Sequence, residues 1–290
     1  MLTLTEVVER LSSTERGMAF VSPEGVERLS YAEIGALTSD LARRWHGVGV
    51  EPGDRVILAL PNKRDFALAF LTAVRAGVVP VPVPGPERNA QVDLVMERVR
   101  SVAPDCRPKL VMTAPSLTEL CSAAAMVPAV TLDGLASASP DSATVPIAPE
   151  DVAFLQYTSG STGAPKGIAI SHANILANLK AIAGVLRLSN EDVGVSWLPL
   201  HHDMGLIGFL LEPTLLQADV WHLSTAAFIE RPTIWMDWMT RTRASIAYGP
   251  TFAYELVARL ARPRHLEEWD LSAWRVAGCG AEPLRPVVLR

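Results

Sequence analysis

The residues best suited to chemistry lie in one short stretch, YTSGSTGAPKG, from Tyr157 to Gly167. Gly160 and Gly163 can take positive φ angles and let a ligand approach the main chain closely. Successive N–H groups in such a turn form a concave site that binds anions. Lys166 adds one mobile positive charge, and further donors come from the hydroxyls of Thr158, Ser159, Ser161 and Thr162. The segment Thr158–Gly167 therefore predicts a loop that holds a polyphosphate.

This loop differs from the Walker A loop, which reads G-x-x-x-x-G-K-[ST]. Pro165 stands where that motif requires glycine, and Gly167 where it requires Ser or Thr. A flexible surface linker that carries a solvated lysine is the alternative interpretation. The position of the stretch, directly after an apolar segment that resembles a buried strand, favours the phosphate interpretation.

Two more loops are expected directly after strands, at His201–Gly205 and at Cys279–Pro283. In open α/β sheets, ligands gather beyond the carboxyl ends of the strands. We therefore expect these two loops and Thr158–Gly167 to line one crevice.

The pair His201 and His202 suggests either a metal ligand or a contact with an anionic ligand. Adjacent residues in an extended chain point to opposite sides, so we expect one histidine to face the crevice. No third ligand follows at a metal-binding spacing, which favours the contact with an anion. A hydrogen-bonded structural histidine is the alternative, and Asp203 can cap the helix that follows.

The stretch YGPTFAYEL places Gly249 and Pro250 between a strand and a helix. It predicts either a tight turn with Phe252 and Leu256 in the core, or a narrow wall beside an apolar substrate. The residues alone leave both interpretations open. Gly280 and Ala281 could let a flat ring lie on the main chain. Several large side chains in this half could line a tunnel for a substrate, but core packing is their default explanation. They are Trp197, Met204, Met236 and Trp238.

The elements that position these residues alternate between strands and helices, which predicts an α/β fold of layered α/β/α lobes with mainly parallel sheets. The polar, proline-rich segment 133–150 is predicted to connect sub-lobes of about 1–132 and 151–290. Strands are expected at 53–60, 78–85, 109–113, 129–132, 151–158, 193–200, 218–223, 244–249 and 274–280. Helices are expected at 31–47, 65–77, 92–102, 116–125, 172–188 (with Ser171 as N-cap), 206–217 (bent by Pro213), 231–243, 250–262 and from 282 onward.

The composition is that of a globular protein, with 290 residues, 49% hydrophobic, 20% charged and a formal net charge of −5. This acidic balance argues against a general nucleic-acid binder. Cys106, Cys121 and Cys279 show no metal-ligand spacing, which favours reduced thiols in a cytoplasmic protein. Glu6 and Glu9 interrupt any signal-peptide core, and no apolar run is long enough to span a membrane.

Together, these motifs resemble the adenylate-forming superfamily, whose members activate carboxylic acids with ATP. YTSGSTGAPKG closely matches the phosphate-loop signature of that superfamily. Within it, the chain is more similar to fatty acyl-AMP ligases than to acyl-CoA ligases, on the stretches LPLHHDMGLIG, RPTIWMDWMTRTRASIAYGPTFAYELVARL and WRVAGCGAEPLRP. The resemblance spans nearly the whole chain.

The resemblance implies a role for each matched position. Lys166 and His202 would be catalytic, with His202 near the reacting carboxylate and the α-phosphate. Many relatives carry Asn where this chain has Thr251, which leaves details of acyl or adenylate contact open. The ATP phosphates would be held by Thr158, Ser159, Gly160, Ser161, Thr162, Gly163 and Lys166. The adenine would lie beside Gly280, Ala281, Glu282 and Pro283, and the acyl group beside His202, Met204, Gly249, Thr251 and Phe252.

The expected reaction forms an acyl-adenylate from a fatty acid and Mg²⁺·ATP, for transfer to the phosphopantetheine of an acyl carrier protein. The alternatives are a long-chain acyl-CoA ligase, an inactive binding or scaffold module of a larger synthase and, more distantly, a nucleotide kinase. The large domain of the family is longer than this chain, so the resemblance implies an incomplete N-terminal adenylation domain without the C-terminal domain. The metal-binding Glu, the ribose-binding Asp and a catalytic Lys would lie beyond Arg290, so we expect the isolated chain to be inactive or nearly so.

Overall fold

The structure is a computed structural model that describes residues 2–61, 63–86, 91–141, 146–158 and 165–283. The chain forms two compact units: unit 1 contains Met1–Ser12 and Ala32–Ala181, and unit 2 contains Ser13–Tyr31 and Ile182–Arg290. The predicted connector, 133–150, thus lies inside unit 1. The division falls elsewhere because an N-terminal segment pairs with strands from the second half of the chain. Each unit is described by itself below.

Unit 1 contains a parallel four-stranded sheet in the order β4-β3-β5-β6. Residues 56–59 of β3 are all buried, as expected for a parallel strand that is covered on both faces. Pro80 and Pro82 lie in β4, at the end of this strand order, where a missing N–H is tolerated. The strands are β3 (Arg55–Ala59), β4 (Val79–Pro82), β5 (Leu110–Thr113) and β6 (Ala129–Val130).

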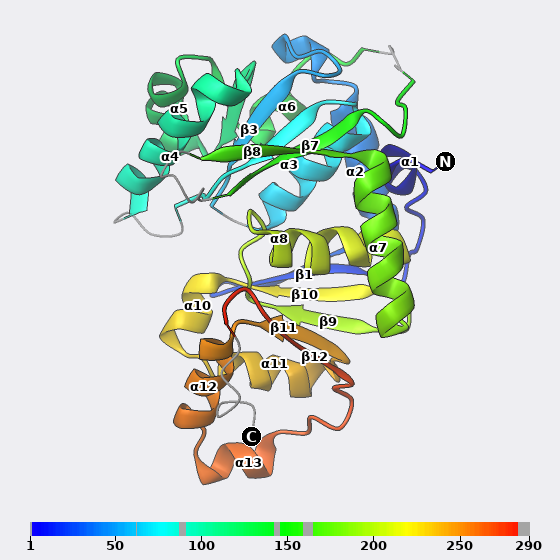
Figure 1. Ribbon diagram of the computed structural model, residues 1–290, viewed down its shortest axis with the longest axis vertical. Coiled ribbons are helices and arrows are strands. Elements are labelled where there is room, and N and C mark those ends of the chain that lie inside the picture. The colour runs from blue at the N-terminus through cyan, green and yellow to red at the C-terminus, as the bar shows by residue number, and fades with distance from the viewer. Residues whose placement is uncertain (1, 62, 87–90, 142–145, 159–164, 284–290) are drawn as a thin grey trace. The chain divides into compact units, whose positions relative to one another are not determined.

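The helices predicted in unit 1 begin close to their predicted positions, although the first ends at Ala42 and not near Gly47. The short helices Leu4–Glu9 and Leu132–Ala136 were not predicted. In α3 nine consecutive residues, from Phe66 to Val74, are buried, so this helix is covered on nearly all sides. Figure 1 shows these helices around the strands of unit 1. They are α1 (Leu4–Glu9), α2 (Tyr31–Ala42, beginning at the unit boundary), η1 (His46–Val48), α3 (Lys63–Arg75), α4 (Val92–Cys106), η3 (Pro115–Leu117), α5 (Thr118–Ala125), α6 (Leu132–Ala136) and α7 (His172–Leu186, which crosses into unit 2).

Unit 1 also contains an antiparallel pair, β7 (Val152–Thr158) and β8 (Lys166–Ser171). The sequence predicted β7 but only a strand end before α7 in place of β8. The N-cap prediction at Ser171 is confirmed, because its Oγ accepts a hydrogen bond from the N–H of Asn174 at 3.2 Å.

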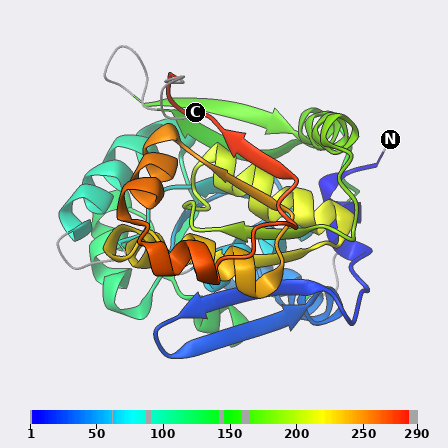
Figure 2. The same ribbon diagram turned by 90° about the horizontal axis from the view of Figure 1, so that it is seen from below.

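Unit 2 is built on a six-stranded sheet in the order β12-β11-β9-β10-β1-β2, in which every pairing except β1 with β2 is parallel. In Figure 2 the β1–β2 hairpin, in blue, lies along one edge of this sheet. The sequence analysis did not predict this hairpin. The strands are β1 (Gly17–Ser22), β2 (Gly25–Ser30), β9 (Val193–Ser196), β10 (Asp219–Leu223), β11 (Ile246–Gly249) and β12 (Val276–Cys279).

Helices cover both faces of this sheet, with α8 and α11 on opposite sides in Figure 1. The predicted loop His201–Gly205 was wrong at its end, because Asp203 already begins a helix and the N–H of Leu206 donates to the carbonyl of His202 at 2.7 Å. The segment preceding Pro213 is a π-helical turn. The helices are α8 (Asp203–Leu206), η4 (Ile207–Leu211), α9 (Glu212–Leu216), α10 (Thr225–Glu230), α11 (Ile234–Thr242), α12 (Thr251–Leu260) and α13 (Pro263–Glu268). The fold is thus α/β with mainly parallel sheets, as predicted.

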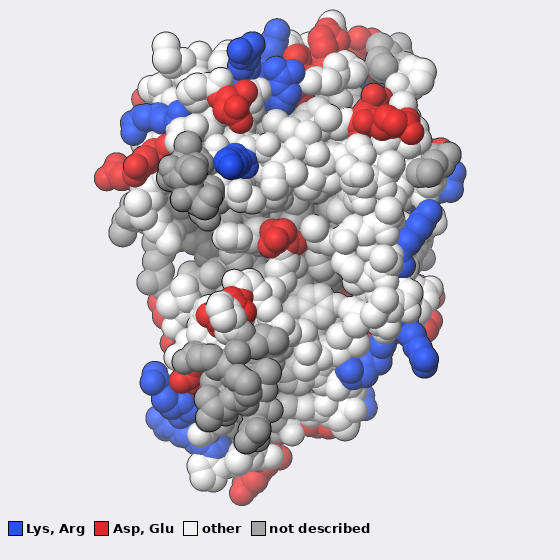
Figure 3. All heavy atoms as spheres, viewed as in Figure 1, with Lys and Arg blue, Asp and Glu red and all other residues white. Residues whose placement is uncertain are grey.

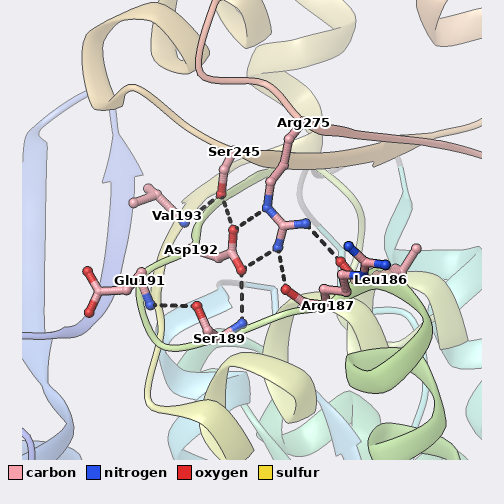
Figure 4. Close-up of polar contacts among 8 residues, drawn as sticks. All are labelled: Leu186, Arg187, Ser189, Glu191, Asp192, Val193, Ser245 and Arg275. Atoms are coloured by element: carbon pink, nitrogen blue, oxygen red, sulfur yellow. Dashed lines mark hydrogen bonds and ion pairs between the residues drawn. The ribbon is translucent and has the colours of Figure 1, made fainter.

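One carboxylate, Asp192, joins the segments that lead into β9, β11 and β12 (Figure 4). Arg275 donates to it from Nε at 2.9 Å and from Nη2 at 2.6 Å, and Ser245 Oγ donates at 2.7 Å. The guanidinium also donates to the carbonyls of Leu186 and Arg187, at 2.8 and 3.0 Å. Burial raises the pKa of Asp192, but the hydrogen bonds from Arg275 and Ser245 outweigh burial, so the pKa is lowered.

A second acidic side chain, Glu212, is buried at the start of α9 with only 3% of its surface exposed. Neither carboxyl oxygen has a hydrogen-bond partner among the residues that the structure describes. Burial raises the pKa of Glu212 to about 7. This carboxyl group is therefore largely protonated in mildly acidic solution. Above neutrality it ionises, and the buried charge lowers the stability of the fold.

The described surface carries charges of both signs. On the face shown in Figure 3, Lys and Arg side chains are interspersed with Asp and Glu and do not gather in one basic patch. Within the described ranges, none of the helices has the length and apolar character needed to cross a lipid bilayer.

We predict that Arg275→Gln lowers the unfolding free energy by on the order of 2 kcal/mol at neutral pH, because it leaves Asp192 without its charged partner. Since the pKa of Asp192 is lowered, this stabilisation is present above the ordinary carboxyl pKa and is lost as the pH falls through the lowered value. Denaturant unfolding across this pH range measures both effects. Arg243→Gln, which breaks an exposed pair with Asp270, is the control. An equal loss in the control would contradict the prediction.

We predict that Glu212→Gln removes part of the pH dependence of stability. The raised pKa of Glu212 means that its neutral form stabilises the fold below the ordinary pKa and that this contribution is lost as the pH rises through about 7. Relative to pH 5, the variant should gain up to about 3 kcal/mol over wild type by pH 8. Glu267→Gln, at an exposed position in α13, is the control. Parallel stability curves for wild type and Glu212→Gln would refute this expectation.

Candidate functional site

The carboxyl ends of β9, β11 and β12 meet at one edge of the unit 2 sheet. These strands are neighbours and run parallel, so the segments that follow them must emerge together. Three of the predicted site segments lie at these strand ends: the one that contains His202 follows β9, and the other two, Gly249–Phe252 and Cys279–Pro283, begin at the last residues of β11 and β12. The predicted loop Cys279–Pro283 was therefore wrong at its start, because Cys279 belongs to β12. The structure therefore brings together residues that lie up to 80 positions apart in the sequence.

Direct contacts join these segments. The N–H of Gly280 donates to the carbonyl of Gly249 at 3.4 Å. A Cβ placed on Gly280 would lie 3.5 Å from Cε of Met204, so the methionine methyl packs against this glycine. Thr251 Oγ1 lies 3.7 Å from Cys279 Sγ. Residues predicted to contact the acyl group and residues predicted to contact adenine thus form one cluster.

Within this cluster Thr251 and Phe252 differ in exposure. Thr251 is fully buried, and its hydroxyl lies against the sulfur of Cys279. Phe252 is 41% exposed and lies at 6.2 Å from Trp197 in an edge-to-face arrangement. Phe252 is therefore the residue of this pair that presents an apolar surface outward.

Glu282 satisfies a backbone donor at the start of α12. Pro250 is the N-cap position of this helix and has no side chain that could accept a hydrogen bond there. The carboxylate of Glu282 instead accepts from the N–H of Phe252 at 2.9 Å. A negative charge at a helix N-terminus is favourable. Glu282 thus fixes the Cys279–Pro283 segment to the helix that carries Phe252.

Ala281 adopts a left-handed conformation, with φ at +66°. A residue with a Cβ pays about 1 kcal/mol or more for this geometry, which is found mainly where the surroundings impose it. The bonds made by Gly280 and Glu282 on either side hold it there. The main chain is thus kinked at Ala281, and both Ala281 and Pro283 are exposed.

The prediction that His201 and His202 point to opposite sides was wrong. Their ring centroids lie 5.0 Å apart. The chain turns just before His202, whose N–H donates to the carbonyl of Pro199, although His202 itself has extended backbone angles. His202 is exposed and His201 is half-buried. Both rings thus belong to one side of the segment.

Aromatic side chains pack against Gly249 and Phe252. Trp197 stacks on Phe228 with ring centroids 3.8 Å apart. A Cβ on Gly249 would lie 3.0 Å from the ring of Trp235, so a side chain there would require the ring to shift. The default core interpretation holds for three of the four large residues, because Trp197, Met236 and Trp238 are buried, whereas Met204 is half-buried.

Sequence reasoning missed Phe228, because helix α10 was not predicted. The signal was present in Ser224, whose Oγ accepts from the N–H of Ala227 at 2.9 Å as an N-cap. It also missed the contact of Trp235 with Gly249. That tryptophan lies in a predicted helix, but no local pattern indicates which strand end it faces.

The other predicted residues lie in unit 1, at the β7–β8 hairpin. Thr158 and Lys166 are register partners at the open end of this pair, and Lys166 is exposed. The predicted loop Thr158–Gly167 was wrong at its end, because Lys166 and Gly167 belong to β8. Ser159, Gly160, Ser161, Thr162 and Gly163 lie outside the described residues. The single crevice expected from all three loops stays a prediction.

No group of three or more His, Cys, Asp or Glu side chains that could hold a metal ion is found among the residues described.

The model of the family described as AMP-binding enzyme matches residues 9–290 of this chain. A Caulobacter vibrioides protein that carries the name of an acyl-CoA synthetase is 36% identical, over 98% of this chain and 50% of its own length. The medium-chain-fatty-acid–acyl-carrier-protein ligase TtuA of Teredinibacter turnerae is 29% identical, over 89% of this chain and 47% of its own length. The chain thus spans about half the length of the curated relatives it matches.

Among solved structures, the fatty acyl-adenylate ligase from L. pneumophila in complex with acyl adenylate and pyrophosphate has a TM-score of 0.88 and 32% identity. That match covers 99% of this chain and 51% of the other. With the family model matching almost the full sequence, the chain belongs to the AMP-binding enzyme family and has the fold of the N-terminal domain of adenylate-forming enzymes.

Proposed function

We propose that the protein containing this chain activates a fatty acid with ATP, giving acyl-adenylate and pyrophosphate, and passes the acyl group to the phosphopantetheine thiol of an acyl carrier protein. The observation that carries the proposal is the carboxyl edge of the unit 2 sheet, where Phe252 is bonded to Glu282 and Met204, two residues after His202, packs against Gly280. This edge combines an exposed imidazole, an outward apolar ring and a kinked main chain. These are the contacts that a carboxylate, an acyl group and a flat base require.

The chemistry explains why few reactive side chains are needed. A fatty acid is ionised at neutral pH, so its carboxylate attacks the α-phosphorus without a general base. A new bond forms between a carboxylate oxygen and the α-phosphorus, the bond to the bridging oxygen of the β-phosphate breaks, and pyrophosphate leaves with the electron pair. The main obstacle is the repulsion between the carboxylate and a polyanion.

Lys166 and His202 are suited to reducing that repulsion. The ammonium group of Lys166 is exposed at the open end of the β7–β8 hairpin, where it can pair with a phosphate oxygen. The exposed ring of His202 can donate an N–H to a carboxylate or phosphate oxygen. Preorganised donors of this kind stabilise the charge that develops in the transition state.

We predict that Lys166→Ala in the full-length protein slows carboxylate-dependent pyrophosphate release by roughly 10²–10³-fold, the typical effect of removing one such donor. The fold should change little, because Lys166 is exposed. Lys180→Ala, an exposed lysine of α7 in the same unit, is the control and should retain the rate. A rate for Lys166→Ala within threefold of wild type, with an unchanged melting temperature, would count against the proposed role.

An acyl-CoA ligase is the second candidate, favoured by the name of the Caulobacter relative. The two functions share the adenylation step and differ in the acceptor thiol. We predict that the full-length protein, given a fatty acid and ATP, acylates a phosphopantetheinylated carrier protein and makes little acyl-CoA from added CoA. Mass spectrometry of both acceptors in one reaction measures the ratio. Predominant acyl-CoA would favour the second candidate.

A further inference from the structure

One buried side chain lies at the base of the hairpin that carries Lys166. Tyr157, the penultimate residue of β7, is 8% exposed and packs into the hydrophobic core of unit 1. The strand opposite is exposed from Lys166 to Ala169. The hairpin is therefore attached to the unit mainly through β7, and Tyr157 is the attachment nearest to its open end.

Both the side chain and the main chain of Tyr157 are bonded to the same helix, α4. Its hydroxyl donates to Oδ2 of Asp105 in the last turn of that helix. Arg98, two turns earlier, donates from Nη2 to the carbonyl of Tyr157 at 3.4 Å. Burial, followed by the hydrogen bond to Asp105, raises the pKa of Tyr157, so the hydroxyl remains a donor. These bonds fix β7 on α4 one residue before Thr158.

The ring of Tyr157 also fixes the opposite strand. Gly167 is its register partner, and a Cβ placed on Gly167 would lie 2.7 Å from Cζ and 2.8 Å from the hydroxyl oxygen of Tyr157. The ring thus occupies the space that a side chain at position 167 would need. Because successive residues in a strand face opposite sides, Lys166 and Thr158 point away from this ring.

We propose that Tyr157, through its hydrogen bond to Asp105, is a positioning residue that holds Lys166 in place for the phosphates of ATP. The inference rests on the proposed function. Tyr157 is buried, and it acts by fixing its own strand position and that of Gly167, the neighbours of Thr158 and Lys166. A loss of this bond lets the end of the hairpin move, which weakens a contact with a phosphate more than a contact with a fatty acid.

The test compares Tyr157→Phe with wild type in the full-length protein, by initial rates of carboxylate-dependent pyrophosphate release. We expect the KM for ATP to rise about three- to tenfold, the equivalent of one hydrogen bond, with an unchanged KM for the fatty acid. Hydrogen exchange of the β8 amides should also become faster in the variant, a readout that does not depend on activity.

Variants of the acceptor separate positioning from simple loss of packing. Asp105→Asn keeps an oxygen acceptor and should remain near wild type, whereas Asp105→Ala should raise the KM for ATP as Tyr157→Phe does. Combining Asp105→Ala with Tyr157→Phe should add nothing, because both remove the same bond.

Tyr31→Phe is the matched control. The hydroxyl of Tyr31 is fully buried and donates to the carbonyl of Ala218 at 2.7 Å within unit 2. The Tyr31→Phe variant should lower the melting temperature about as much as Tyr157→Phe does, and it should leave the KM values for ATP and for the fatty acid unchanged. If Tyr157→Phe also leaves both KM values and the β8 exchange unchanged in an active protein, the inference is overturned. If the wild type makes no acyl-adenylate, the proposed function itself fails.

Discussion

The site of unit 2 depends on one carboxylate that lies at the other end of its strands. Asp192 precedes β9 by one residue, Ser245 precedes β11 by one residue, and Arg275 precedes β12 by one residue. Their mutual bonds align the amino ends of three parallel strands, and the register continues from there through Ile246 opposite Gly194 and Val276. Each strand is only four residues, or about 13 Å, long. An error of register at Asp192 would therefore be transmitted directly to the carboxyl edge.

At the carboxyl edge the positions of the site residues follow from that alignment. Gly249 and Cys279 are paired across β11 and β12, so Pro250 and Gly280 leave the sheet side by side. The bond from Phe252 N–H to Glu282 then joins the two outgoing segments, and the strained conformation of Ala281 lies between fixed neighbours. At this edge Trp197 packs against Phe252, and Trp235 packs against Gly249.

Much of the fold, and the positions of the site segments at strand ends, could be predicted from the sequence because the signals were local. Apolar runs such as that of β3, the N-cap at Ser171, and the turn at Gly249 and Pro250 depend on neighbouring residues alone. The fold class followed from their alternation. Motif positions at strand ends were found for the same reason, since a polar or glycine-rich segment after an apolar run marks the end of a strand.

The remaining features depend on partners distant in sequence. β1 contains an apolar run, Met18 to Val21, followed by the turn residues of SPEG, but its parallel partner is β10, about 200 positions later. The contact of Trp235 with Gly249 likewise has no local signal. The division of the chain into units was also not predictable locally, because Ser13–Tyr31 belongs to unit 2 only through that distant pairing.

The position of β1 has a consequence for the order of assembly on the ribosome. Met18 pairs opposite Val220, so one side of β1 cannot find its native neighbour until about 200 further residues have been made. At typical rates of translation this takes on the order of 10 to 40 seconds. Pairings of such long range also form slowly, because a long loop must close first. During synthesis the β1–β2 hairpin must therefore wait with an open edge while much of unit 1 can already fold.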